Sequence, residues 1–321
     1  MTLPGLAASL ALVAAGIAGF GLWVNHRARR RERQAERAFP PAGQFIGPPG
    51  QRIHAEVMGA GPDVVLIHGA SGNTRDFTHS LTDRLAGEFR VTVFDRPGLG
   101  WSDPLQADGD SPAAQARALR DAANSLGLRN PIVVGHSYGG AVAMAWALEA
   151  PQETAAVVLL GGATMPWPGG LGFWYALTAT RIGRAVIVPL VTAFAPRSKI
   201  DDAMRVVFEP DPLPADYDRH FAAGLTMRRR VLAENARQVN GLRPYVVDMA
   251  ARYGHLRLPV EIVHGTADTI VPADIHALPL ARLLPDAVLT LLPGIGHMPH
   301  HAAPEAVVAA IRRAAERGGL R

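Results

Sequence analysis

Short apolar runs alternate with longer amphipathic stretches over most of the chain. The runs that predict strands are Asp63–His68, Arg90–Asp95, Pro131–Gly135, Ala156–Leu160, Val260–His264 and Ala287–Leu292. Their nearly continuous apolar character is typical of parallel strands that helices cover on both faces. A helical pattern occupies Ser111–Leu126, Tyr138–Ala150 and Pro304–Arg317. Gln51–Met58 predicts an antiparallel strand at the edge of the sheet. We therefore expect a doubly wound α/β fold with a mostly parallel sheet, whose active site forms at the carboxyl ends of the strands.

One long interval interrupts this alternation. About 95 residues, Ala163–Leu258, separate two of the predicted strands, which is far too many for a simple crossover. We expect a helical insertion there, and we call it the lid because it would lie over the carboxyl ends of the strands.

The N-terminal part of the chain has a different pattern. From Leu3 to Val24 run 22 residues without a charged side chain. As a helix they would span roughly 33 Å, about the thickness of the hydrocarbon core of a bilayer. Trp23 lies where aromatic side chains favour the membrane interface, and an arginine cluster follows. Because basic flanks stay on the cytoplasmic side, we expect a single-pass transmembrane helix in the inner (cell) membrane and a cytoplasmic globular domain.

Two other interpretations of this segment stay open. Small residues around Ala14–Gly19 are compatible with a cleaved signal peptide, although no Lys or Arg precedes the apolar run. A buried helix of a soluble protein is the second, and the arginine cluster argues against it. Prolines and glycines at 40–50 then predict a linker. The expected organisation is a transmembrane anchor at 1–25, a basic flank and linker at 26–50, an α/β core at 51–162 and 259–321, and the lid at 163–258.

The charge of the chain is concentrated beside the apolar segment. The net charge of +4 at pH 7 equals that of Arg27–Arg37, where six arginines stand with two glutamates, so the rest of the chain is neutral. No basic face is predicted for the globular domain, and we expect no nucleic-acid partner. The chain has no cysteine, which excludes disulfides, thiolate catalysis and cysteine-ligated metals.

The segment Gly135-His136-Ser137-Tyr138-Gly139 places a serine between a predicted strand and a predicted helix. A sharp turn of this kind projects the serine hydroxyl at the top of the sheet, and its glycines leave room for a strained backbone. The helix behind the serine directs its positive end at a developing oxyanion. A dinucleotide-binding loop would need glycine at the position of Ser137. The other alternative is a tight turn that contains a serine without a catalytic role. We take Ser137 as the candidate nucleophile.

A serine nucleophile needs a base, and the base needs an acid that orients it, in the chain order Ser, Asp, His. Asp268 follows the first strand predicted after the lid, and His297 follows the next strand through Gly294-Ile295-Gly296. Both lie at the carboxyl ends of their strands, so we expect Asp268 and His297 to meet Ser137 at one edge of the sheet.

Other residues near these positions are alternatives. Asp274 is the nearest substitute for the acid, but it lies beyond Pro272, where a helix is expected to begin. His300 and His301 are the alternatives for the base. Only His297 directly follows the flexible glycine turn, and this position favours it.

The loop His68–Asn73 follows the first parallel strand. In a site of this type such a loop supplies one backbone donor of an oxyanion hole, and the residue after the nucleophile supplies the other. We expect these donors to be the N–H groups of Ala70 and Tyr138. Each is worth roughly 2.7–4 kcal/mol of barrier lowering in characterised enzymes.

Together these motifs resemble the α/β-hydrolase superfamily over about residues 50–318. The matching segments are His68-Gly69, Asp95-Arg96-Pro97-Gly98-Leu99-Gly100-Trp101-Ser102, the turn at Ser137, His264-Gly265-x-x-Asp268 and Gly296-His297. The resemblance implies a central sheet of about eight strands, a lid after the sixth, and hydrolysis of ester or related bonds without a cofactor or a metal. It also implies that Asp95 and Arg96 brace the loop beside the site.

The reaction within this superfamily is less constrained. Epoxide hydrolases and haloalkane dehalogenases use an aspartate nucleophile, so Ser137 argues against both. A carboxylesterase or lipase-like activity on a small, ester-type substrate is the main expectation. A perhydrolase resembling haloperoxidases, or a carbon–carbon bond hydrolase, would use the same triad. A non-enzymatic ligand-binding module is an alternative of another class, and the complete triad argues against it. The oligomeric state is not predicted.

Aromatic residues in the lid give the one hint about the substrate. Met165–Tyr175 contains Trp167 and Trp174, in a chain that is only 6% aromatic. They could pack the lid onto the core, line an apolar acyl pocket, or touch the membrane. We take Trp167 and Trp174 as candidate substrate-binding residues.

Overall fold

The computed structural model describes residues 3–170 and 172–320, in which eight strands form one sheet with the order β1-β2-β4-β3-β5-β6-β7-β8. The strands are β1 Gln44–Ile46, β2 Ile53–Met58, β3 Asp63–Ile67, β4 Arg90–Phe94, β5 Ile132–His136, β6 Ala156–Leu160, β7 Val260–Gly265 and β8 Ala287–Leu292. All neighbours from β4 to β8 pair in parallel, while β2 is antiparallel to β4 and β1 to β2. The predicted doubly wound, mostly parallel sheet is confirmed.

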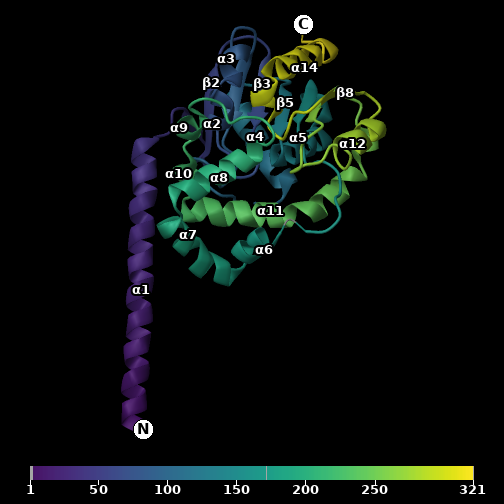
Figure 1. Ribbon diagram of the computed structural model, residues 1–321. Helices are drawn as coiled ribbons and strands as arrows, with labels where there is room; N and C mark the ends of the chain where they lie inside the picture. The colour runs from purple at the N-terminus through teal and green to yellow at the C-terminus, as the bar shows by residue number, and fades with distance from the viewer. Residues whose placement is uncertain (1–2, 171, 321) are drawn as a thin grey trace.

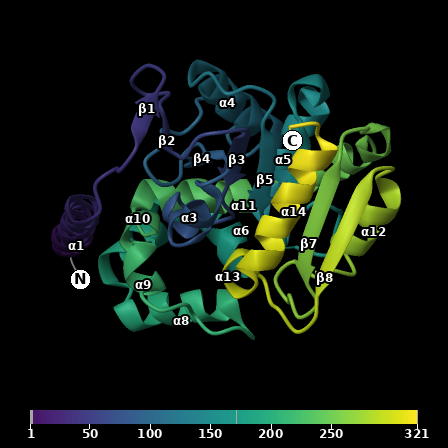
Figure 2. The same cartoon turned by 90° about the horizontal axis from the view of Figure 1, so that it is seen from above.

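Helices cover both faces of this sheet because its parallel strands are apolar on both sides. Along β3, Val65 and Ile67 face one core cluster, and Val64 and Leu66 face the other. The helices on the first face are α4 Pro112–Ser125, α5 Tyr138–Glu149 and α12 Ala277–Leu283; those on the second are α2 Arg75–Thr78, α3 Leu81–Leu85 and α14 Pro304–Arg317. Seen from above, α14 crosses the sheet on the face opposite α4 and α5 (Figure 2). The short helix α13, Pro299–Ala302, precedes α14.

The lid follows β6, as expected, and is helical. Its helices are α6 Phe173–Ala179, α7 Val188–Phe194, α8 Arg197–Phe208, α9 Tyr217–His220, α10 Ala223–Thr226 and α11 Arg229–Ala250. A π-helical turn, Gly183–Ile187, precedes α7. In Figure 1, α6, α7 and α11 lie below the sheet, on the side of the core that is nearer to the N-terminal end of α1.

The N-terminal helix α1, Leu3–Ala38, is long and apolar enough to span a membrane by length and composition. It stands out from the globular part in Figure 1. The arginine cluster continues the helix, because no glycine or proline occurs between Asn25 and Phe39. The helix ends just before Pro40, so the basic flank is not part of an extended linker.

The edge of the sheet differs from the prediction. Strand β2 is not the edge strand, because Gln44–Ile46 pairs antiparallel with it, with Gln44 opposite Ala55. Part of the segment expected to be a linker therefore belongs to the sheet. A strand of three residues between Gly43 and Gly47 is too short to show a period of two, and this explains why the sequence pattern did not indicate it.

Candidate active site

Ser137 lies in the turn between β5 and α5, where its backbone adopts φ 52° and ψ −120°. This is a conformation that residues with a side chain rarely adopt. Two glycines allow it: a Cβ on Gly135 would overlap the carbonyl oxygen of Gly139, and a Cβ on Gly139 would overlap that of Ile67. The strained turn is held by hydrogen bonds from the Ser137 N–H to the Leu160 oxygen and from the Ala163 N–H to the Ser137 oxygen, each 3.0 Å.

His297 and Asp268 form a hydrogen-bonded pair. Nδ1 of His297 lies 2.8 Å from Oδ2 of Asp268, and both side chains are buried. The loops after β7 and β8 position the two residues, as the sequence predicted for strand ends. Asp274 makes no such contact with His297 among the hydrogen bonds of the described residues. An imidazole held by a carboxylate in this way can accept a proton from a nearby hydroxyl.

The carboxyl of Asp268 is stabilised in its ionised form. Burial raises its pKa, but hydrogen bonds from His264 and His297 outweigh burial and hold the pKa below its ordinary range. Oδ1 also accepts the backbone N–H groups of Ile270 at 2.9 Å and Val271 at 2.8 Å. Asp268 is therefore a fixed anion that orients His297. Sequence reasoning missed His264 as a second partner, because a histidine inside a strand looks like an ordinary core residue.

The loop after β3 crosses directly over Ser137. A Cβ added to Gly69 would lie 3.0 Å from Cβ of Ser137, and Ala70 lines the same cavity as Ser137. Tyr138 is the first residue of α5, and the first N–H groups of a helix have no partner within the helix. Of the two residues expected to supply donors, Tyr138 directly follows the serine at the start of α5, and Ala70 lines the same cavity as the serine.

Arg96 holds this loop in place. Its guanidinium is fully buried and donates to the carbonyl oxygens of His68, at 2.9 Å, and Gly69, at 3.0 Å. It also lies over the ring of Tyr138, with 4.2 Å from Cζ to the ring centre. Burial lowers the pKa of Arg96 to about 10, so it remains charged at neutral pH. The bracing role that the resemblance implied for Arg96 agrees with these contacts.

A cavity of about 540 Å³ connects these residues to the lid. Ser137 and His297 line it at the sheet, and Trp174, Val191 and Met204 are among the mainly apolar residues that line it in the lid. A larger hollow of about 840 Å³ lies where α1 meets the core and is lined by neither Ser137 nor His297. Volume alone therefore does not identify the cavity that Ser137 and His297 line.

The two tryptophans expected to bind substrate have different positions. Trp174 lines the cavity. Trp167 does not, and the expectation for this residue is corrected: it is buried in the core beside His276, with 5.8 Å between ring centres. Its carbonyl oxygen accepts a hydrogen bond from Arg243. The two residues are seven positions apart, and composition could not tell which of them faces the cavity.

Residues 64–310 match the family model described as the alpha/beta hydrolase family. The chain belongs to the alpha/beta hydrolase family. The 2-hydroxy-6-oxo-6-phenylhexa-2,4-dienoate hydrolase of Burkholderia cepacia is 28% identical over 259 residues, which cover 77% of this chain and 85% of that protein. An uncharacterised protein of Mycobacterium tuberculosis is 29% identical over 304 residues, 89% of this chain and 84% of its own.

Solved structures show the same fold. A membrane phospholipase A superposes with a TM-score of 0.68 at 21% identity, covering 99% of this chain and 98% of its own. An esterase from Rhodococcus sp. ECU1013 has a TM-score of 0.66 at 22% identity, covering 84% of this chain and 96% of its own.

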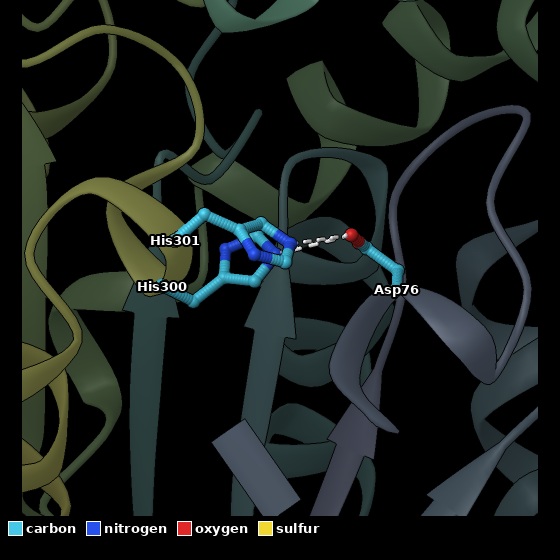
Figure 3. Close-up of side chains that lie close together, drawn as sticks. All are labelled: Asp76, His300 and His301. Carbon is cyan, nitrogen blue, oxygen red and sulfur yellow. Dashed lines mark hydrogen bonds and ion pairs between the residues drawn. The ribbon is translucent and has the colours of Figure 1, made fainter. Parts of the chain in front are cut away.

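This alpha/beta hydrolase also contains a buried polar cluster that sequence analysis missed. Nε2 of His301 lies 3.0 Å from Oδ1 of Asp76, and Nε2 of His300 lies 3.3 Å from the same oxygen (Figure 3). The hydroxyl of Tyr217 donates to that oxygen at 2.7 Å. Burial lowers the pKa of His300 to about 4, so this imidazole is neutral at pH 7. Neither His300 nor His301 contacts Asp268, so His297 is the histidine paired with the acid.

The cluster also has the composition of a metal site, since the ligand atoms of Asp76, His300 and His301 lie within 4.8 Å of one another. A metal-binding histidine usually donates its second ring N–H to a fixed partner. Within the described residues, Nδ1 of His300 and of His301 has no such partner. Because Tyr217 also donates to the carboxylate, the arrangement fits a hydrogen-bonded buried anion better than a metal centre.

Proposed function

We propose that this alpha/beta hydrolase is a serine hydrolase, carboxylesterase or lipase-like, that cleaves an ester or related acyl bond of a small apolar substrate. The observation that carries the proposal is the strained turn at Ser137, which opens into the cavity that His297 lines while Asp268 holds its imidazole. A serine in such a turn has its hydroxyl exposed for attack on a carbonyl carbon.

The proposed reaction has two halves. In the first, His297 takes the proton of Ser137 Oγ as that oxygen bonds to the carbonyl carbon. The N–H groups of Ala70 and Tyr138 stabilise the resulting oxyanion. The carbon–oxygen bond to the alcohol then breaks, and the alcohol leaves with the proton from His297. In the second, His297 takes a proton from water, the hydroxide attacks the acyl-enzyme, and Ser137 regains its proton as the acid leaves. Every proton is returned, so the proposal needs neither a cofactor nor a metal.

A fluorophosphonate probe tests the nucleophile. It should label the wild-type protein and not Ser137→Ala, whose kcat on an ester should fall by about 10⁶-fold. Ser71→Ala is the matched control, because Ser71 lines the same cavity. Labelling should persist in that variant. Labelling that survives in Ser137→Ala would contradict the proposal.

The apolar cavity predicts a preference for longer acyl chains. Each buried methylene contributes about 0.8 kcal/mol, so kcat/KM should rise roughly threefold to fourfold per methylene until the cavity is full. We would measure p-nitrophenyl esters from acetate to decanoate. Trp174→Ala should flatten the rise, because Trp174 lines the cavity, while acetate turnover should persist. Acetate as the best substrate of the wild type would refute an acyl pocket.

Carbon–carbon bond hydrolysis is the second candidate, because the Burkholderia cepacia relative is named as a hydrolase of 2-hydroxy-6-oxo-6-phenylhexa-2,4-dienoate. The same serine and histidine would serve this reaction. Consumption of that dienoate, followed by its absorbance, separates the candidates: we expect ester turnover to be faster.

We also propose that α1 anchors the protein in the inner (cell) membrane as a single span, with the catalytic domain in the cytoplasm. The length and apolar character of α1 and the arginines that follow its apolar part support this.

A further inference from the structure

The lid exposes large apolar side chains at one place. At the start of α6, Phe173 is 79% and Trp174 45% exposed, and near the π-helical turn Ile182 is 75% and Val186 49% exposed. We call these four residues the lid tip. A soluble surface rarely gathers side chains of this size without a partner. Arg181 and Arg184 are exposed between them, so the lid tip combines apolar residues with positive charge.

The lid tip adjoins α7, the lid helix that packs against α1. Trp23 of α1 packs against Phe194 of α7, with 5.2 Å between ring centres, and the guanidinium of Arg27 lies 5.1 Å from the same ring. Figure 1 shows α7 close to α1, and α6 at a similar level along α1 but farther from it, well short of the C-terminal end of α1. Trp23 marks the end of the apolar segment of α1. The lid tip therefore lies near the level at which the proposed span leaves the membrane.

The contact between α1 and the lid is extensive and specific. Val24 and Ala28 of α1 are buried with Ala193 of α7. Glu32 accepts hydrogen bonds from the side chain of Arg229, at 2.7 and 2.8 Å, and from its backbone N–H at 2.9 Å. These contacts fix the lid to α1. The depth at which α1 sits in the bilayer therefore determines how far the lid lies from the membrane.

Neither helix of the lid tip is long enough to cross a membrane by itself, although the two together have the length and composition of a bent span. Helix α6 and the helical segment Gly183–Phe194 meet at 91°, and neither approaches the ~20 residues that a span requires. Apolar side chains on short helices with arginines beside them are typical of segments that lie in the interface, with their apolar side about 5–10 Å deep. The arginines would remain among the lipid head groups.

We propose that the lid tip inserts into the leaflet from which α1 emerges, and that the enzyme draws its acyl substrate from this leaflet. The substrate class is then a membrane lipid ester. Trp174 links the two sites, because it is part of the exposed lid tip and also lines the catalytic cavity. The inference rests on the proposed membrane anchor and the proposed esterase activity.

Fluorescent labels test the insertion directly, since the chain contains no cysteine of its own. Full-length Ile182→Cys, Leu22→Cys and Val288→Cys would each carry a nitrobenzoxadiazole label in phosphatidylcholine vesicles with or without nitroxide-bearing acyl chains. Leu22 is exposed on α1, and Val288 is exposed on β8, at the far edge of the sheet. Nitroxide lipid should quench the labels at 182 and 22 and leave the label at 288 unchanged. A label at 182 that behaves like the one at 288 would overturn the inference, and an unquenched label at 22 would overturn the anchor as well.

Activity gives the second readout. The double variant Ile182→Asp with Val186→Asp changes two residues that do not line the cavity. It should lose about tenfold in kcat/KM on a fluorogenic lipid ester embedded in vesicles, because two charged side chains would replace apolar ones that are buried in the leaflet. Turnover of soluble p-nitrophenyl butyrate should be unchanged. Equal activity of variant and wild type on the vesicles would refute lipid delivery. Failure of the wild type to cleave either ester would instead refute the proposed function.

Discussion

At Ser137, a non-glycine residue keeps a left-handed backbone because its neighbours leave it no relaxed alternative. Its N–H and carbonyl groups are bonded to Leu160 and Ala163, and the close approach of β3 to the turn is possible only because residue 139 is glycine. Strain of this kind costs of order 1–3 kcal/mol and persists where the surrounding structure over-determines it. Backbone strain at a serine that lines a cavity supports a catalytic role for this residue.

The pairing of one histidine with one carboxylate yields a prediction about three variants. Asp268→Asn should retain the fold and reduce kcat by about 10⁴-fold, because the amide would hold the imidazole of His297 in the wrong tautomer. His297→Ala should abolish turnover. His301→Ala is the matched control: it removes a buried histidine that contacts Asp76 instead. Ester turnover by purified protein measures all three, and an inactive His301→Ala with a normal fold would show that the base is misassigned.

Among the structural elements, the loop after β3 is held in position by a residue that is distant in the sequence. The two carbonyl groups at its start accept hydrogen bonds from Arg96, which lies in the loop after β4. The fork of a guanidinium reaches both carbonyls at once, while an ammonium group cannot reproduce this geometry. Arg96 is thus a positioning residue, which acts on the proposed oxyanion donor Ala70 through the backbone.

We therefore predict that Arg96→Lys lowers kcat by up to about 10²-fold, the size of effect expected when a reacting group is displaced by about 1 Å. KM should change much less, because the apolar wall of the cavity is in the lid. Arg117→Lys, on the surface of α4, is the control and should change neither constant. A fall in thermal stability with an unchanged kcat at low temperature would indicate that Arg96 is only structural.

For the whole molecule, the arginines after the apolar segment predict the orientation in the membrane. A reporter that is active only in the periplasm should be silent when fused after Arg321, and one that is active only in the cytoplasm should work. Replacing the exposed Arg29, Arg30 and Arg33 by alanine should increase the inverted fraction, since these three side chains do not carry the contact with the lid. A strong periplasmic signal from the wild type would favour the export-signal interpretation.

The sequence by itself determined the parts of the molecule that local patterns encode. Nearly continuous apolar runs specified six of the strands, since parallel strands that helices cover on both faces are mostly apolar; β8, at the edge, is only partly buried. Residues that immediately follow such strands meet at one edge, which is why Ser137, Asp268 and His297 could be assigned to one site. The turn at Ser137 was readable for the same reason: its glycines lie within two residues of it.

Only the tertiary structure decided the contacts between distant segments. Asp76 and His301 are 225 positions apart, and nothing in either local sequence indicates the other. The same holds for Glu32 and Arg229, which join the N-terminal helix to the lid, and for Trp174, which faces the cavity although its aromatic character resembles that of Trp167. Periodicity tells which side of an element is apolar, but not what covers that side. That choice is made when the elements pack, because only then do burial and hydrogen-bond partners become defined.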